Sequence, residues 1–138
     1  MRVIFACIHN AGRSQMAAAF YNQLAGGGAR SAGTRPGECV HPEVVSVMRE
    51  VGIDLSNARP QLLTAELTRD ADLLVTMGCG DKCPFVAGLE VQDWPIPDPK
   101  GKPLEAVRQI RDEIESRVAA LLGQTTVHGS EDPLAENA

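Results

Sequence analysis

A cysteine and an arginine separated by five residues stand near the start of the chain, in the segment Cys7-Ile8-His9-Asn10-Ala11-Gly12-Arg13-Ser14. A cysteine thiolate is a strong nucleophile, and nearby N–H dipoles and a guanidinium favour the thiolate over the thiol. The planar guanidinium of an arginine presents donors that match the oxygens of a tetrahedral oxyanion. The segment therefore predicts a nucleophile and an anion-binding group on one loop.

The sequence on either side indicates how this loop is held. Residues 3–6 are apolar and predict a short buried strand, whereas residues 14–24 are rich in alanine and predict a helix. Backbone N–H groups at such a strand-to-helix turn form an anion site, aided by the positive end of the helix. The predicted oxyanion-binding residues are Ile8, His9, Asn10, Ala11, Gly12, Arg13 and Ser14.

Strand and helix patterns alternate along the rest of the chain. Further strands are predicted at 29–32, 73–77 and 89–94, and further helices at 41–51, 61–67 and 103–122. This alternation predicts an α/β fold in three layers, with a short parallel sheet of about four strands between helices. We expect one domain over residues 1–122 and a C-terminal tail without periodicity over 123–138.

Three chemically suggestive stretches follow predicted strands. They begin at Cys7, after Met77 and after Trp94. Because ligands of open parallel sheets bind beyond the carboxyl ends of the strands, these stretches are expected to meet at one edge.

Composition excludes several other classes of function. The chain has 138 residues and a net charge of −5, which argues against nucleic acid as a partner. No apolar run approaches the roughly 20 residues of a membrane span, and the N-terminus lacks a signal-peptide pattern. Cys79 and Cys83 are too close together to staple a fold, so we expect catalytic thiols in a reducing, cytoplasmic compartment.

At the level of motifs, the chain resembles the arsenate reductases built on the low-molecular-weight protein tyrosine phosphatase fold. The resemblance rests on four stretches and extends over about residues 2–122. They are residues 7–17, Ser31-Ala32-Gly33-Thr34, Thr76-Met77-Gly78-Cys79, and Asp93-Trp94 with Asp98-Pro99. The Cys-x5-Arg-Ser loop alone indicates only the superfamily. Together with the two later cysteines and the Asp-Pro pair, it favours arsenate reduction.

The resemblance implies a role for each residue of the first step. Arg13 holds arsenate, the Cys7 thiolate attacks arsenic, and Asp98 protonates the oxygen that leaves. Ser14 would stabilise the thiolate by a hydrogen bond, and Asn10 would brace the loop. Phosphate or sulfate would compete as oxyanions.

The resemblance also implies a disulfide relay. Cys79 would attack Cys7, and Cys83 would then attack Cys79 and pass the disulfide to an external reductant. Thioredoxin is the implied reductant, but a sister class uses mycothiol with a mycoredoxin, and glutathione with glutaredoxin is a further alternative. Gly12 stands where many relatives carry an additional loop cysteine, so the sequence leaves the donor open.

No cofactor and no metal are expected. Some relatives bind potassium through acidic side chains beside the loop, but the matching positions here are Ala18 and Gln61. A zinc site built from Cys79, Cys83, Cys39 and His41 is the less favoured interpretation of the later cysteines.

Two other functions remain as alternatives. A tyrosine phosphatase would need the same Cys7, Arg13 and Asp98, but Lys100-Gly101-Lys102 follows the Asp-Pro pair where such phosphatases carry aromatic residues. A non-catalytic oxyanion-binding or redox-sensing module would bind arsenate or phosphate without producing arsenite.

Overall fold

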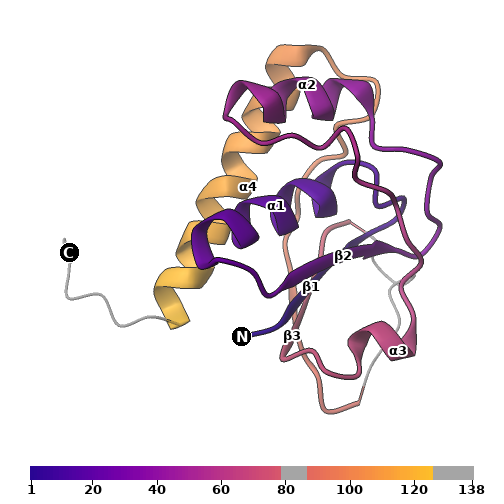
Figure 1. Cartoon of the computed structure of the whole chain (residues 1–138), viewed down its shortest axis with the longest axis vertical. Helices are drawn as coiled ribbons and strands as arrows, with labels where there is room; N and C mark the ends of the chain where they lie inside the picture. The colour runs from indigo at the N-terminus through magenta and orange to yellow at the C-terminus, as the bar shows by residue number, and fades with distance from the viewer. Residues whose placement is uncertain (79–86, 126–138) are drawn as a thin grey trace.

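The computed structural model describes residues 1–78 and 87–125. Within them the chain forms a parallel sheet with strand order β2-β1-β3-β4. The elements, labelled in Figure 1 except for β4, are β1 (Val3–Cys7), α1 (Arg13–Ala25), β2 (Ala29–Gly33), α2 (Pro42–Glu50), α3 (Ala65–Thr68), β3 (Leu73–Thr76), β4 (Glu90–Asp93) and α4 (Leu104–Thr125). The predicted α/β class and parallel sheet are confirmed.

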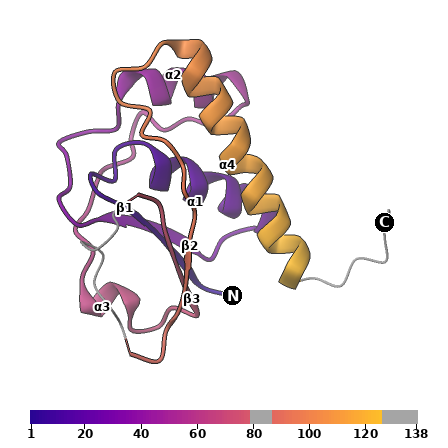
Figure 2. The ribbon, with the colours of Figure 1, turned by 180° about the vertical axis from the view of Figure 1, so that it is seen from behind.

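The two faces of the sheet are covered unequally. Helices α1, α2 and α4 lie on one side and the short α3 on the other, as Figures 1 and 2 show. Successive side chains of a strand point to opposite faces. Accordingly, Phe5 and Cys7 belong to the large core under α1 and α4, and Ile4 and Ala6 to a smaller cluster on the other face. Strand alternation thus places Cys7 on the same side of the sheet as α1.

The prediction of a helix over 61–67 is wrong for its first half. Residues 61–63 are extended along the free edge of β2, where Gly33 N–H donates to the Gln61 carbonyl and Leu63 N–H donates to the Gly33 carbonyl, each at 2.8 Å. The helix α3 begins only after Thr64, whose hydroxyl accepts from Leu67 N–H at 3.1 Å. Edge pairing to β2 and this N-cap together outweigh the local pattern.

The last helix continues to Thr125, three residues beyond its predicted end at 122. Residues 126–138, most of the predicted tail, lie outside the described residues. In the part of the chain that the structure describes, no helix combines the length and apolar character needed to cross a bilayer.

Candidate functional site

The loop between β1 and α1 is bound by backbone hydrogen bonds to the segment that follows β2. Arg35 N–H donates to the Ile8 carbonyl at 2.8 Å, and His41 N–H donates to the Ala11 carbonyl at 2.9 Å. His9 adds a ring contact, with Nδ1 lying 3.0 Å from the Arg35 carbonyl oxygen. The segment that follows β2 therefore holds the loop in shape at several points along its length.

Cys7 is buried at the end of β1, with 2% of its surface exposed. Its sulfur lies 2.9 Å from Ser14 Oγ, and Asn10 Nδ2 donates to the same Oγ at 2.7 Å. Because Oγ accepts from Asn10, its own hydrogen is available to the sulfur. The predicted contacts of Ser14 with Cys7 and of Asn10 with the loop are both present.

The guanidinium of Arg13 joins the loop to the segment after β4. Arg13 is 6% exposed, and its NH1 donates to the Ile96 carbonyl at 3.0 Å. Its NH2 lies 3.8 Å from Asp98 Oδ2, while the other oxygen of Asp98 accepts from Lys100 N–H at 3.0 Å. The Asp98 side chain remains half-exposed, so a carboxyl group that solvent can reach stands beside a buried cation.

The segment after β3 reaches the same guanidinium. Gly78 follows Met77 with a φ of +87°, and a Cβ at this position would overlap Arg13 NH1. Both the left-handed backbone and the close approach require glycine here. The expectation that the three post-strand stretches meet at one edge is confirmed for the described residues.

The Asp98-Pro99 pair packs directly on the loop. A Cβ built on Gly12 would lie 2.9 Å from Cγ of Pro99 and 3.6 Å from Cδ2 of His41. A glycine at this position therefore lets the proline ring, and with it Asp98, approach the loop backbone closely.

The sequence-based prediction missed two glutamines that surround Asn10. Gln15 Nε2 donates to the Asn10 carbonyl at 3.1 Å and to Asn10 Oδ1 at 3.2 Å, and Gln61 N–H donates to Oδ1 at 2.9 Å. The Gln61 side chain in turn donates to the Ser31 carbonyl at 2.9 Å. The sequence held one signal for Gln15: it is a polar residue in the first turn of a helix, on the side expected to face the protein interior.

The remaining thiols divide between described and undescribed parts of the chain. Cys39 is a free, exposed cysteine in the loop before α2. Cys79 and Cys83, on which both the disulfide relay and the zinc alternative depend, lie outside the described residues.

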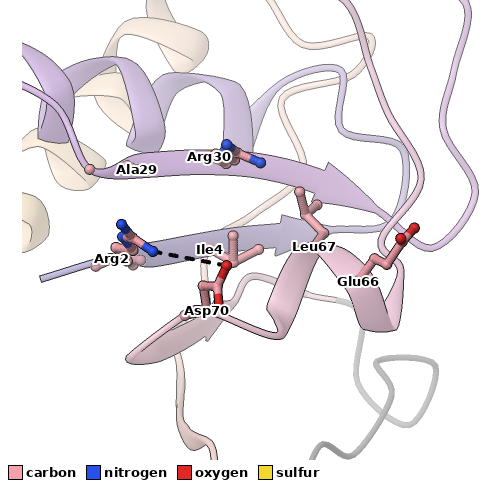
Figure 3. A pocket seen from close by; sticks show the side chains of 10 residues that line it. Arg2, Ile4, Ala29, Arg30, Glu66, Leu67 and Asp70 are labelled. Carbon is pink, nitrogen blue, oxygen red and sulfur yellow. Dashed lines mark ion pairs between the residues drawn. The ribbon is translucent and has the colours of Figure 1, made fainter.

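A separate cavity of about 340 Å³ lies between α3 and the amino ends of β1 and β2 (Figure 3). Arg2 and Asp70 form an exposed ion pair of 4.0 Å beside it. The residues that line it come from the amino ends of β1 and β2 and from α3 and the turn after it, and they include none of the described candidate site residues. The described candidate site residues therefore lie away from this cavity, at the opposite, carboxyl edge of the sheet.

Comparison with known proteins identifies the family. Residues 2–131 match the model described as low molecular weight phosphotyrosine protein phosphatase. The glutaredoxin arsenate reductase of Synechocystis is 34% identical over 128 residues, which cover 89% of this chain and 97% of that protein.

Two solved structures give the same result. The thioredoxin-dependent arsenate reductase of Corynebacterium glutamicum is 39% identical with a TM-score of 0.76, over 89% of this chain but only 60% of its own. The arsenate reductase of Archaeoglobus fulgidus is 33% identical with a TM-score of 0.77, over 88% of this chain and 99% of its own. With its loop, fold and relatives in agreement, the chain belongs to the low molecular weight phosphotyrosine protein phosphatase family.

Proposed function

We propose that this protein reduces arsenate to arsenite with Cys7 as its nucleophile. The observation that carries the proposal is the loop itself, where a buried cysteine contacts a serine hydroxyl and a buried arginine pairs with an aspartate. The named relatives with this fold are arsenate reductases, so the substrate proposed for the loop is arsenate.

In the first step the loop residues from Ile8 to Ser14 would bind arsenate through their backbone N–H groups and the Arg13 guanidinium. The Cys7 thiolate attacks arsenic, so an S–As bond forms and an As–O bond breaks. Asp98, whose Oδ2 stands 3.8 Å from the guanidinium, supplies the proton with which the oxygen leaves as water.

In the second step a thiolate attacks the sulfur of Cys7. A new S–S bond forms and the S–As bond breaks. The electron pair of the broken S–As bond leaves with arsenic, which is thereby reduced to arsenite. We assign this attack to Cys79, the residue after Gly78, because Gly78 lies against the Arg13 guanidinium. Cys83 then attacks Cys79, restores the Cys7 thiolate and leaves a Cys79–Cys83 disulfide.

A dithiol redoxin would reduce that disulfide. We propose thioredoxin as this partner, since the C. glutamicum relative is thioredoxin-dependent, while the name of the Synechocystis relative points to glutaredoxin as the alternative. Mycothiol with mycoredoxin is the third candidate, and in that case the small thiol itself would take arsenic from Cys7. Phosphate and sulfate are expected to compete with arsenate because they share its tetrahedral shape and charge.

The relay is tested by single-turnover arsenite release from fully reduced protein without added thiol, followed by mass spectrometry. About one arsenite per protein is expected, with a Cys79–Cys83 disulfide afterwards. Cys79→Ser should release none, and Cys83→Ser should leave a Cys7–Cys79 disulfide, while Cys39→Ser serves as the matched control. Arsenite that appears only after mycothiol or glutathione is added would contradict the roles given to Cys79 and Cys83.

Hydrolysis of phosphate esters is the second candidate, favoured by the family description. It would use the same Cys7, Arg13 and Asp98. The residues that follow Trp94, at 95–102, carry no aromatic side chain that could grip a phenyl ring. Phosphate release from p-nitrophenyl phosphate is therefore expected to be far slower than single-turnover arsenite release, and the reverse order would favour a phosphatase.

A further inference from the structure

We infer that Gln15 is a positioning residue for the Cys7 thiolate, acting through Asn10 and Ser14. The inference rests on the proposed role of Cys7 as nucleophile. The test below measures the reactivity of the Cys7 thiol without arsenate, so its result does not depend on whether the protein reduces arsenate.

The orientation of the Asn10 side chain is fixed by a group that can only donate. Gln61 N–H lies 2.9 Å from Asn10 Oδ1, so the carbonyl end of this amide must face Gln61. The NH2 end is thereby directed at Ser14 Oγ, 2.7 Å away.

This orientation sets the direction of the next hydrogen bond. A serine hydroxyl has one hydrogen, and Ser14 Oγ already accepts from Asn10 Nδ2. Its hydrogen can therefore point to Cys7 Sγ at 2.9 Å, where it stabilises the thiolate as a charge-assisted bond. A flipped Asn10 amide would instead present an acceptor to Ser14 and draw this hydrogen away from the sulfur.

Gln15 donates to both oxygen atoms of Asn10, the backbone carbonyl oxygen and the side-chain Oδ1. Its Nε2 has three oxygens around it, the Asn10 carbonyl at 3.1 Å, Asn10 Oδ1 at 3.2 Å and the Arg59 carbonyl at 3.3 Å. Only the NH2 end of an amide can face three acceptors, so the orientation of Gln15 is also determined. Gln15 as a whole residue is 7% exposed, and hydrogen bonds of a buried amide are costly to lose.

The contacts of Gln15 also restrain the backbone of Asn10, which has a left-handed conformation that non-glycine residues rarely adopt. Asn10 has a φ of +52° and is the non-glycine residue with positive φ in the described part of the chain. Because Gln15 binds the Asn10 carbonyl and the Arg59 carbonyl together, it ties the left-handed turn to the segment whose Gln61 N–H supplies the other donor. Gln15 thus supports the orientation of Asn10 from two directions.

The test compares Gln15→Glu and Gln15→Met with Gln23→Glu, a matched change at an exposed position of the same helix. Iodoacetamide alkylation of Cys7 is followed over pH by mass spectrometry of the Cys7 peptide. Gln15→Glu keeps the shape of the side chain but replaces the donor Nε2 with a carboxylate oxygen. That oxygen would face the three carbonyl oxygens to which Nε2 donates. We expect the pH midpoint of alkylation to rise by about half a unit or more, which lowers the alkylation rate about threefold at pH values well below the midpoint.

Gln15→Met removes the donors without adding charge or acceptors, and it is expected to raise the midpoint less than Gln15→Glu. Gln23→Glu should leave the midpoint where it is in the unmodified chain. An unchanged midpoint in folded Gln15→Met would overturn the inference, and so would equal shifts in Gln15→Glu and Gln23→Glu. Loss of arsenite release with an unchanged midpoint would also reject this role for Gln15, whatever it implies for the reduction.

Discussion

At the residue scale, the site combines a buried cation with a carboxyl group that stays half in solvent. Arg13 donates to the Ile96 carbonyl and pairs with Asp98, and Asp98 accepts from Lys100 N–H, so both side chains have partners at the site. Solvent can therefore reach Asp98 while its Oδ2 stays beside the guanidinium that we propose binds the oxyanion. A group of this kind suits a general acid.

Replacing Asp98 tests this role. Asp98→Asn keeps the shape and the contact with Lys100 N–H but removes the proton donor, so we expect the first step to slow by about 100-fold or more. Single-turnover arsenite release measures this rate, with Asp70→Asn at an exposed site as the control. A rate within a few-fold of that of the unmodified chain would show that the proton comes from elsewhere.

At the element scale, two contacts set the geometry of the site. The loop after β4 reaches the loop after β1 because Gly12 leaves room for the ring of Pro99. Away from the site, Arg108 and Arg111 of α4 both bind Glu50 at the end of α2, and Arg111 NH1 also donates to the Val47 carbonyl at 2.8 Å. The first contact positions Asp98, and the second joins the helices that cover this side of the sheet.

Gly12→Ala tests the first contact. The new methyl group would push Pro99 and Asp98 away from the loop, and we expect arsenite release to slow roughly tenfold. Gly37→Ala is the control, since a Cβ there meets its nearest atom at 3.8 Å. Adding Pro99→Ala should remove most of the cost of Gly12→Ala, and an equal cost with and without Pro99→Ala would contradict the explanation.

Glu50 gives a prediction about stability and pH. The hydrogen bond from Arg108, joined by that from Arg111, lowers the pKa of Glu50 below its ordinary value. A carboxyl whose pKa is lower when folded stabilises the fold above its ordinary pKa, and this contribution disappears as the pH falls through the folded pKa. Glu50→Gln should therefore be less stable than the unmodified chain at neutral pH, with the difference closing in acid.

Urea unfolding midpoints between pH 7 and pH 3 measure this difference, with Glu115→Gln on the exposed side of α4 as the control. A difference between the Glu50→Gln protein and the unmodified chain that stays constant over the whole range would mean that the ionised carboxylate is not what stabilises α2 against α4.

At the scale of the whole molecule, the local sequence pattern predicted correctly those elements whose structure depends mainly on their own residues. The apolar run of β1, the alanine-rich α1 and the cysteine and arginine at the two ends of the loop predicted the loop and its position at the carboxyl edge. Residues 61–63 were mispredicted because their structure depends on the free edge of β2, which lies much earlier in the chain. The part played by Gln15 depends on oxygens from two other segments, which periodicity does not reveal.

The central claim is that Cys7 carries arsenic through the reduction, and one comparison tests it most directly. Single-turnover arsenite release is measured for the unmodified reduced chain, Cys7→Ser and the control Cys39→Ser. We predict about one arsenite per protein for the unmodified chain and for Cys39→Ser, and none for Cys7→Ser. Arsenite release from folded Cys7→Ser at the rate of the unmodified chain would contradict the account.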